Sequence, residues 1–325
     1  MDIILITKYL TTTIILFTGM IFYFRVAGKY NIIDKPNGRS SHDYVTIRGG
    51  GIVFWLAAML YCLNLSSLKD LTGLSGFFAL GITLISAVSL WDDIKSLPNS
   101  VRILIHFVSI SCIFYGLEIF GIGNGWLIMA AYLFSVGVLN ACNFMDGING
   151  MTGLYSLAVL TALQIVNYQV IKFTIPEFIN YAIIACIIFL FFNFRKKARC
   201  FAGDIGSVGI SFWIVTLLLQ LMIKDRSFIW IFFLSVYGVD SICTILHRLY
   251  LRQNIFKAHR MHFYQMLSNE WGISHLKVSA MYASAQLLIC GLIIYFREYQ
   301  VQFAVTMIII LSVVYSLKFR KIKKS

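Results

Sequence analysis

Long apolar stretches follow one another along almost the whole 325-residue chain, and they decide what it can fold into. An α-helix that crosses a bilayer needs about 20 mostly apolar residues. Stretches that approach this length occur at residues 3–24, 50–66, 73–91, 102–119, 126–142, 151–171, 179–194, 207–223, 227–246, 278–296 and 300–317. Hydrophobic residues make up 59% of the chain and charged residues 13%, which is too apolar for a soluble globule. We therefore predict an all-α polytopic membrane protein with about eleven transmembrane helices.

The segments between these stretches leave no room for a second domain. The chain has 3 prolines, and it shows no long polar stretch, internal repeat or low-complexity segment. We expect a single membrane domain over residues 1–325. The first stretch lacks a basic n-region and a small-residue cleavage site, so a signal peptide is not expected. The 7 cysteines lie mostly in apolar stretches without C-x-x-C spacing, which favours small hydrophobic side chains over disulfides or zinc ligands.

The net charge of +13 is distributed by topology. If the eleven stretches cross the bilayer alternately, 21 of the 27 lysines and arginines fall on one side. The positive-inside rule makes that side cytoplasmic and the N-terminus periplasmic. The charge therefore predicts orientation in the membrane, and it does not indicate nucleic-acid binding.

Acidic residues on the predicted cytoplasmic side gather in short motifs that follow apolar stretches. Asp92 and Asp93 are adjacent, and like charges raise one another's pKa unless a cation shares them. Oxygen ligands with an incomplete protein shell suit Mg²⁺ or Mn²⁺, which keep waters and bind substrate phosphates. The pair therefore favours a metal site, and the alternative is an acidic helix end balanced by Lys95.

Two further motifs carry polar side chains at helix ends. Asn140, Asn143, Asp146 and Asn149 recur at three-residue steps, which suits a nucleobase edge or a metal ligand set. The alternative for these residues is hydrogen bonding between membrane helices.

The second motif runs from Phe201 to Ser207 and follows a basic cluster at residues 195–199. In it, Phe201 suits stacking on a nucleobase, Asp204 suits a metal that holds a diphosphate, and Ser207 suits a helix cap.

Two basic loops on the same side are candidates for phosphate binding. The first contains Arg39 and Arg48 and ends in the glycines at 49–51, whose N–H groups would be open near a helix N-terminus. A flexible basic hinge is the alternative.

The second loop contains His259, Arg260 and His262. Without a third obvious zinc ligand, phosphate binding is favoured over zinc, and lipid contact is the alternative. Asp240, in the apolar stretch before this loop, has Arg248 as its candidate partner, in a site or in a structural ion pair.

Together these motifs resemble the polyprenyl-phosphate N-acetylhexosamine-1-phosphate transferase superfamily, of glycosyltransferase family 4 type. The resemblance runs from Asp34 to about Gln265 through RSSH…RGGG, DDxxK, NxxNFMDGxNG, FxGDxGS and HR…AHRxH, in family order. The NFMDG and AHRMHFYQ patterns look most like the branch that initiates O-antigen synthesis. The resemblance implies transfer of GlcNAc-, FucNAc- or QuiNAc-1-phosphate from a UDP-sugar to undecaprenyl phosphate, with release of UMP.

The resemblance also implies roles for individual residues. The catalytic set is Asp92, Asp93, Asp146 and Asp204, and Asp93 is the candidate for orienting or deprotonating the acceptor phosphate. Mg²⁺, or Mn²⁺ in its place, is expected on Asp204, Asp92 and Asn143. The substrate-binding set is Arg39, Arg48, Lys95, Asn143, Asn149, Phe201, His259, Arg260 and His262. Phe201 corresponds to a uracil-stacking aromatic residue, and Asn149 replaces an aspartate of many relatives, which keeps hydrogen bonding to uracil but removes an acid or base role.

A polytopic transporter or lipid-phosphate flippase that uses the same carboxylates as an ion relay is the alternative function. Transporters tend to place such groups near the bilayer midplane, often within internal repeats. Here the carboxylates sit at helix ends and no repeat is visible, which favours the enzyme. The donor sugar, single or double displacement, and formation of a homodimer are left open by the sequence.

Overall fold

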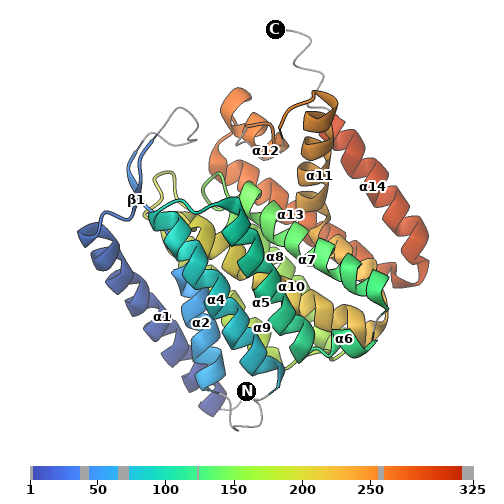
Figure 1. Ribbon diagram of the computed structural model, residues 1–325, viewed down its shortest axis with the longest axis horizontal. Coiled ribbons are helices and arrows are strands. Elements are labelled where there is room, and N and C mark those ends of the chain that lie inside the picture. Colours follow the sequence, from blue (N-terminus) through green and yellow to red (C-terminus); the bar gives the residue numbers. More distant parts are fainter. Residues whose placement is uncertain (1–2, 37–43, 65–72, 123, 255–259, 317–325) are drawn as a thin grey trace.

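The computed structural model describes residues 3–36, 44–64, 73–122, 124–254 and 260–316. The long helices in this part of the chain are α1 (Ile3–Lys29), α2 (Ile52–Leu63), α4 (Leu74–Ile94), α5 (Asn99–Gly116), α7 (Gly125–Met145), α8 (Met151–Gln169), α9 (Pro176–Asn193), α10 (Gly203–Asp225), α11 (Ser235–Tyr250), α13 (His275–Tyr295) and α14 (Gln300–Ser316). They form one bundle (Figure 1). The predicted all-α class is confirmed.

Short elements lie between the long helices. They are α6 (Ile119–Ile122), α12 (Phe263–Gln265), the 3₁₀ segments η1 (Ile229–Leu234) and η3 (Arg297–Tyr299), and the π-helical segment η2 (Met266–Glu270). The strands β1 (Ile33–Asp34) and β2 (Thr46–Ile47) pair antiparallel, with Ile33 opposite Ile47.

Each predicted apolar stretch overlaps a long helix, but the count of eleven spans is not confirmed. Within the described residues, eight segments are long and apolar enough to cross a bilayer, and in one of them η1 and α11 run on as Ile229–Tyr250. The segments α2 and Gln302–Ser316 are apolar but shorter, and α8 is not among the eight. The chain is therefore a multi-pass membrane protein in which the apolar pattern places helices better than it counts crossings.

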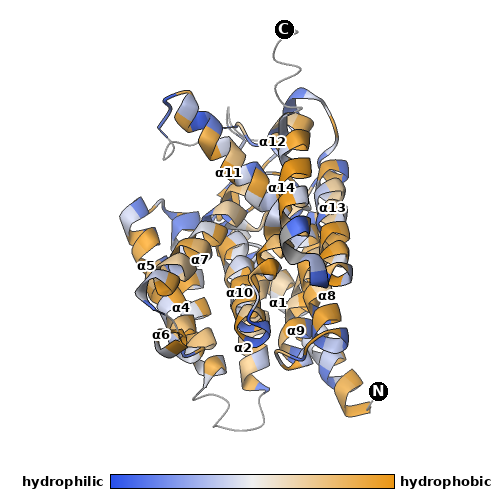
Figure 2. Cartoon of the chain, turned by 90° about the vertical axis from the view of Figure 1, so that its right-hand side faces the viewer, coloured by the Kyte–Doolittle hydropathy of each residue, from blue (hydrophilic) through white to orange (hydrophobic). Residues whose placement is uncertain are grey.

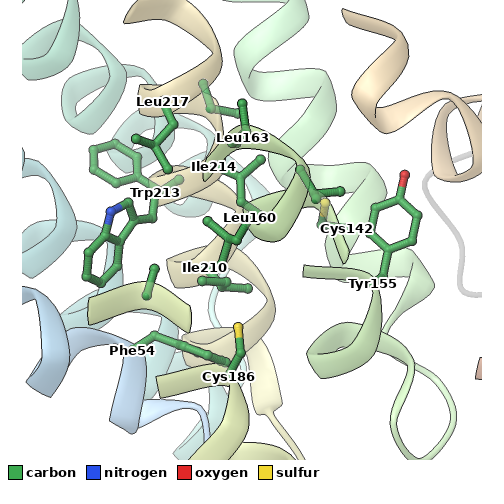
Figure 3. Packing of buried hydrophobic residues seen from close by; sticks show 14 of the residues in the cluster. Phe54, Cys142, Tyr155, Leu160, Leu163, Cys186, Ile210, Trp213, Ile214 and Leu217 are labelled. Atoms are coloured by element: carbon green, nitrogen blue, oxygen red, sulfur yellow. The ribbon is translucent and has the colours of Figure 1, made fainter. Parts of the chain in front are cut away.

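The helices of the bundle consist mostly of apolar residues (Figure 2), and many large apolar side chains are exposed, as expected of helices that face lipid. Large side chains such as Ile14, Leu133 and Leu288 are exposed on α1, α7 and α13. By contrast, α10 is enclosed by other helices over its whole apolar window. Its Ile210, Trp213, Ile214 and Leu217 pack in the core together with residues of α2, α8 and α9 (Figure 3).

The N-terminal end of α10 is joined to the segment that leads into α2. The N–H of Phe201 donates to the carbonyl oxygen of Ile47 at 2.8 Å, and the N–H groups of Gly50 and Gly51 donate to the carbonyls of Phe201 and Ala202 at 2.8 and 3.0 Å. A Cβ added to Gly51 would lie 2.7 Å from the backbone nitrogen of Gly206, so glycine allows the two helix ends to touch.

These contacts correct the expectation that glycines 49–51 form an open anion site. The N–H groups of Gly50 and Gly51 are taken up by the segment before α10.

Candidate active site

The carboxylate of Asp93 caps the N-terminal end of α10. Its side chain is fully buried on α4, and it accepts hydrogen bonds from the backbone N–H groups of Asp204 at 2.9 Å and Ile205 at 3.1 Å. The first N–H groups of a helix have no partner within it, and a negative charge there is favourable. Arg48 completes the arrangement with its Nε 2.6 Å from Asp93 Oδ1. The geometry thus favours a positioning role for Asp93, because both carboxylate oxygens already have partners.

Two arginines link three aspartates in one continuous network. Arg48 also lies 3.4 Å from Asp204 Oδ1. On the other side, Arg102 lies 3.1 Å from Asp204 Oδ2 and 3.2 Å from Asp92 Oδ2. The Asp92 carboxylate is within hydrogen-bonding range of Asp204 and accepts the N–H of Leu97 at 2.6 Å. The structure therefore brings together Asp92, Asp93, Asp204 and Arg48, as the sequence predicted.

Arg102 is the residue that the sequence analysis missed. It lies in the first turns of α5, whereas Asp92 lies near the end of α4. The connection between the two helices is short, so the antiparallel helices bring residues ten positions apart face to face. A basic residue in the first turns after an acidic helix end is the signal that could have identified it.

Asp146 ends α7 and faces the same network. Its Oδ1 accepts a 2.5 Å hydrogen bond from the hydroxyl of Thr152, at the start of α8. Burial raises the pKa of Asp146 to about 7, and the hydrogen bond from Thr152 opposes this rise. The charges of Asp204 and Arg48 also act on the pKa of Asp146, which links the motif of Asp146 to the network of the other aspartates. Asn143 is half-buried on the last turn of α7, and its role as a metal ligand stays a prediction.

Asn149 is buried and organises the basic loop that precedes α10. Its Nδ2 donates to the carbonyls of Arg195 and Lys196 at 2.8 and 3.3 Å and to the Tyr44 hydroxyl at 3.2 Å. The same hydroxyl accepts the N–H of Ala198 at 2.8 Å. These contacts take up the amide N–H groups of Asn149, so the predicted hydrogen bond to uracil stays a prediction for its Oδ1.

Phe201 and Lys95 border the network. Phe201 is half-buried in the segment three residues before Asp204. Lys95 follows the last residue of α4 and is exposed. Stacking by Phe201 and phosphate binding by Lys95 stay predictions. Arg39 and His259 lie outside the described residues.

The last predicted loop packs against the end of α7 through a buried polar cluster. Asp240 accepts the N–H groups of Phe263 at 2.9 Å and Tyr264 at 3.3 Å and the hydroxyl of Tyr282 at 2.7 Å. The Nδ1 of His262 lies 3.4 Å from Asp240, and the Tyr264 hydroxyl donates to the carbonyl of Phe144, two residues before Asp146.

This cluster changes two expectations. His262 is 2% exposed, so the geometry favours a structural role over phosphate binding. Asp240 caps α12 and pairs with His262, whereas Arg248, its expected partner, donates to the carbonyl of Asn254 at 2.5 Å. Arg260 is half-buried beside the cluster, and phosphate binding by it stays a prediction.

An apolar groove runs along α7 toward the C-terminal end of that helix. It has a volume of about 550 Å³ and is lined by α7, by η1 with α11, and by α14. Along α7 the lining runs from Leu133 to Phe144, so the groove reaches to within two residues of Asp146. Asn140 is one of the few polar residues along it.

The fold and these contacts define a polytopic membrane protein with a charged site at one end of its helices. The model of glycosyl transferase family 4 matches residues 74–222, a segment that contains Asp92, Asp93, Asp146 and Asp204.

Curated proteins extend the likeness. A probable undecaprenyl-phosphate N-acetylglucosaminyl 1-phosphate transferase of Bacillus subtilis is 27% identical over 266 residues, which are 77% of this chain and 73% of that protein. The undecaprenyl-phosphate alpha-N-acetylglucosaminyl 1-phosphate transferase of Escherichia coli is 26% identical over 284 residues, 81% and 75% of the two chains. A phospho-N-acetylmuramoyl-pentapeptide-transferase of Streptococcus agalactiae is 25% identical over 248 residues, 66% and 73%. The family model and these relatives together support the polyprenyl-phosphate N-acetylhexosamine-1-phosphate transferase family, of glycosyltransferase family 4 type.

Proposed function

We propose that the protein transfers an N-acetylhexosamine-1-phosphate from a UDP-sugar to undecaprenyl phosphate and releases UMP. The observation that carries this proposal is the position of the groove. A lipid chain in the groove would lie against α7, and its phosphate would reach the end of that helix at Asp146. The electrostatic interaction of Asp146 with Asp204 links this position to the arginine-rich network.

The carboxylates of Asp92 and Asp204 fit a divalent metal. Mg²⁺ is typically held by one or two carboxylates together with substrate phosphates and waters. When bound, Mg²⁺ or Mn²⁺ would neutralise charge on the diphosphate and the leaving UMP.

The chain's own residues supply position, charge and a proton site. Arg48 and Arg102 supply positive charge for the diphosphate beside Asp204. An oxygen of the lipid phosphate forms a bond to the β-phosphorus of the UDP-sugar. The bond from that phosphorus to the bridging oxygen breaks, and the electron pair leaves with UMP.

A phosphate monoester is largely dianionic near pH 7, so only modest general-base help is needed. Asp146 suits this task better than Asp93, because both carboxylate oxygens of Asp93 accept hydrogen bonds from the start of α10, whereas the hydrogen bond from Thr152 engages one oxygen of Asp146.

The finer assignments belong to the same proposal. The sequence resemblance supports a role in O-antigen synthesis with the site on the cytoplasmic side of the inner membrane. Likeness to phospho-N-acetylmuramoyl-pentapeptide-transferases supports a second candidate, a step of cell-wall synthesis. The two candidate functions, in O-antigen synthesis and in cell-wall synthesis, use the same chemistry at the diphosphate, and they differ in the sugar that the site accepts.

Mass spectrometry of lipid products tests the proposal. Purified protein is incubated with Mg²⁺, undecaprenyl phosphate and, in separate reactions, UDP-GlcNAc, UDP-FucNAc, UDP-QuiNAc or UDP-MurNAc-pentapeptide. We expect one donor to give a lipid-linked sugar diphosphate together with an equal amount of UMP. Absence of product from every donor, together with movement of the lipid phosphate across vesicle membranes, would favour the transporter.

A further inference from the structure

Arg102 occupies the carboxylate oxygens that a metal would need. Its Nη1 lies 3.2 Å from Asp92 Oδ2, and its Nη2 lies 3.1 Å from Asp204 Oδ2. The other oxygen of Asp92 accepts the Leu97 N–H, and the other oxygen of Asp204 faces Arg48. Both carboxylates are largely buried, and their negative charges lie close together. Such a pair is costly unless a cation shares it.

The two arginines of the network are held very differently. Arg48 pairs with the fully buried Asp93, its N–H donates to the carbonyl of Ile32, and its own carbonyl accepts the hydroxyl of Tyr23. Displacing Arg48 would leave Asp93 as a buried, uncompensated charge. Both arginine side chains are partly exposed, but the ion pairs of Arg102 are with the two metal-site aspartates, neither of which caps α10. Of the two, Arg102 can leave the carboxylates without disturbing the cap of α10.

We propose that Arg102 is an internal counterion that holds Asp92 and Asp204 together before substrate arrives, and that it exchanges with the divalent metal. This inference rests on the metal site of the proposed function. A cation that binds the same oxygens must displace the guanidinium. The released side chain has a new anionic partner only when the diphosphate is also present. Metal and UDP-sugar should therefore each raise the affinity of the protein for the other.

The experiment measures Mn²⁺ affinity and stability in the purified protein. Mn²⁺ binding is followed by electron paramagnetic resonance with and without UDP, and the melting temperature is recorded in EDTA. The variants are Arg102→Gln and Arg102→Lys, with Lys197→Gln as control. Lys197 is an exposed lysine of the loop before α10, and within the described structure it contacts none of the three aspartates.

Arg102→Gln should bind Mn²⁺ without UDP at least about 5-fold more tightly than the native protein, the lower end of typical coupling between ligands. Its melting temperature in EDTA should fall, and UDP should add less to its Mn²⁺ affinity. The Mn²⁺ affinity of Arg102→Lys should lie between those of the native protein and Arg102→Gln. Lysine keeps the positive charge but lacks the planar guanidinium group that bridges two carboxylates. Lys197→Gln should change Mn²⁺ affinity by less than about 2-fold, since Lys197 is exposed to solvent, where salt screens its charge.

The outcomes separate the inference from the function on which it rests. Equal or weaker Mn²⁺ binding by Arg102→Gln, with normal binding by the native protein in the presence of UDP, would overturn the counterion alone. Failure of all proteins to bind Mn²⁺ with UDP present would overturn the metal site and the inference together. If Arg102→Gln does not fold, Arg102→Lys decides the matter, and an affinity no higher than that of the native protein overturns the counterion.

Discussion

Removal of the hydroxyl group of Thr152 should shift the pH dependence of catalysis. This hydroxyl donates to Asp146 Oδ1 at 2.5 Å, a short hydrogen bond to a carboxylate whose pKa burial raises to about 7. Thr152→Val keeps the shape of the side chain and removes the donor. A hydrogen bond to a charged group contributes about 1.5–3 kcal/mol, and about 1.4 kcal/mol corresponds to one pKa unit. The pKa of Asp146 should therefore rise further, by about 1 to 2 units.

The sign of the effect follows from which form of Asp146 is active. Below its pKa Asp146 is neutral, and above it the residue is a carboxylate that can accept a proton. With the carboxylate as the active form, kcat/KM of the native protein should rise with pH through about 7. This rise of kcat/KM should occur at higher pH in Thr152→Val and should be absent in Asp146→Asn.

The stability of the folded protein should fall with rising pH, whereas kcat/KM should rise. The folded-state pKa of Asp146 lies above its ordinary value of 3.8, so its contribution to stability is full at low pH. That contribution is lost as the pH rises through about 7. The melting temperature should therefore fall over this range, and less so in Asp146→Asn.

The assay is release of UMP as a function of pH, at donor concentrations well below KM. Thr152→Ser is the matched control, because it keeps the hydroxyl and removes only a methyl group. We expect the serine variant to keep the midpoint of the native protein. The reasoning is refuted if the valine and serine variants share one midpoint, or if valine moves it to lower pH.

Three further predictions test the metal, the nucleotide contact and the helix packing. EDTA should abolish UMP release and Mg²⁺ or Mn²⁺ should restore it, while Asp204→Asn should lower turnover at least about 100-fold; full activity in EDTA would contradict the metal assignment. Phe201→Ala should weaken UDP-sugar binding in calorimetry by about 1–3 kcal/mol, and unchanged affinity would remove the stacking role. Gly51→Ala should lower the melting temperature, because the new methyl group would lie 2.7 Å from the backbone nitrogen of Gly206. Gly291→Ala, with no atom within 4 Å, should not, and equal losses would contradict the packing argument.

The sequence predicted the positions of the helices because span length and apolarity are local properties. The ends were harder to place, because they depend on distant residues. The stretch predicted to begin at residue 207 forms a helix from Gly203, and the first turn is capped by Asp93 of another helix. The number of crossings was not predictable from apolarity alone, because α8 is largely buried among other helices and accommodates polar side chains such as Asn167.

The acidic motifs identified the site, and the roles within it required the structure. Asp92 and Asp93 are neighbours in sequence, but they point in different directions from α4. One meets Arg102, and the other caps α10. Asn149 and His262 carry the same chemistry as ligand-binding side chains, yet both are used internally by groups far away in the chain. Pattern and spacing show which residue types gather, and the rotation of each helix decides which of them face the substrate.

The enclosure of α10 bears on how the protein enters the membrane. The apolar window of this helix is fully buried inside the folded protein, yet it is among the most apolar of the spans. Neighbouring helices could satisfy polar side chains on α10, so its final surroundings do not require this apolarity. Insertion into the membrane requires this apolarity, because the segment contacts lipid before its neighbouring helices have packed around it. The polar residues Ser207, Ser211 and Thr216 each donate to a carbonyl of their own helix, so they can enter the bilayer without a partner. The apolarity of α10 is thus explained by membrane insertion, and packing in the folded protein does not require it.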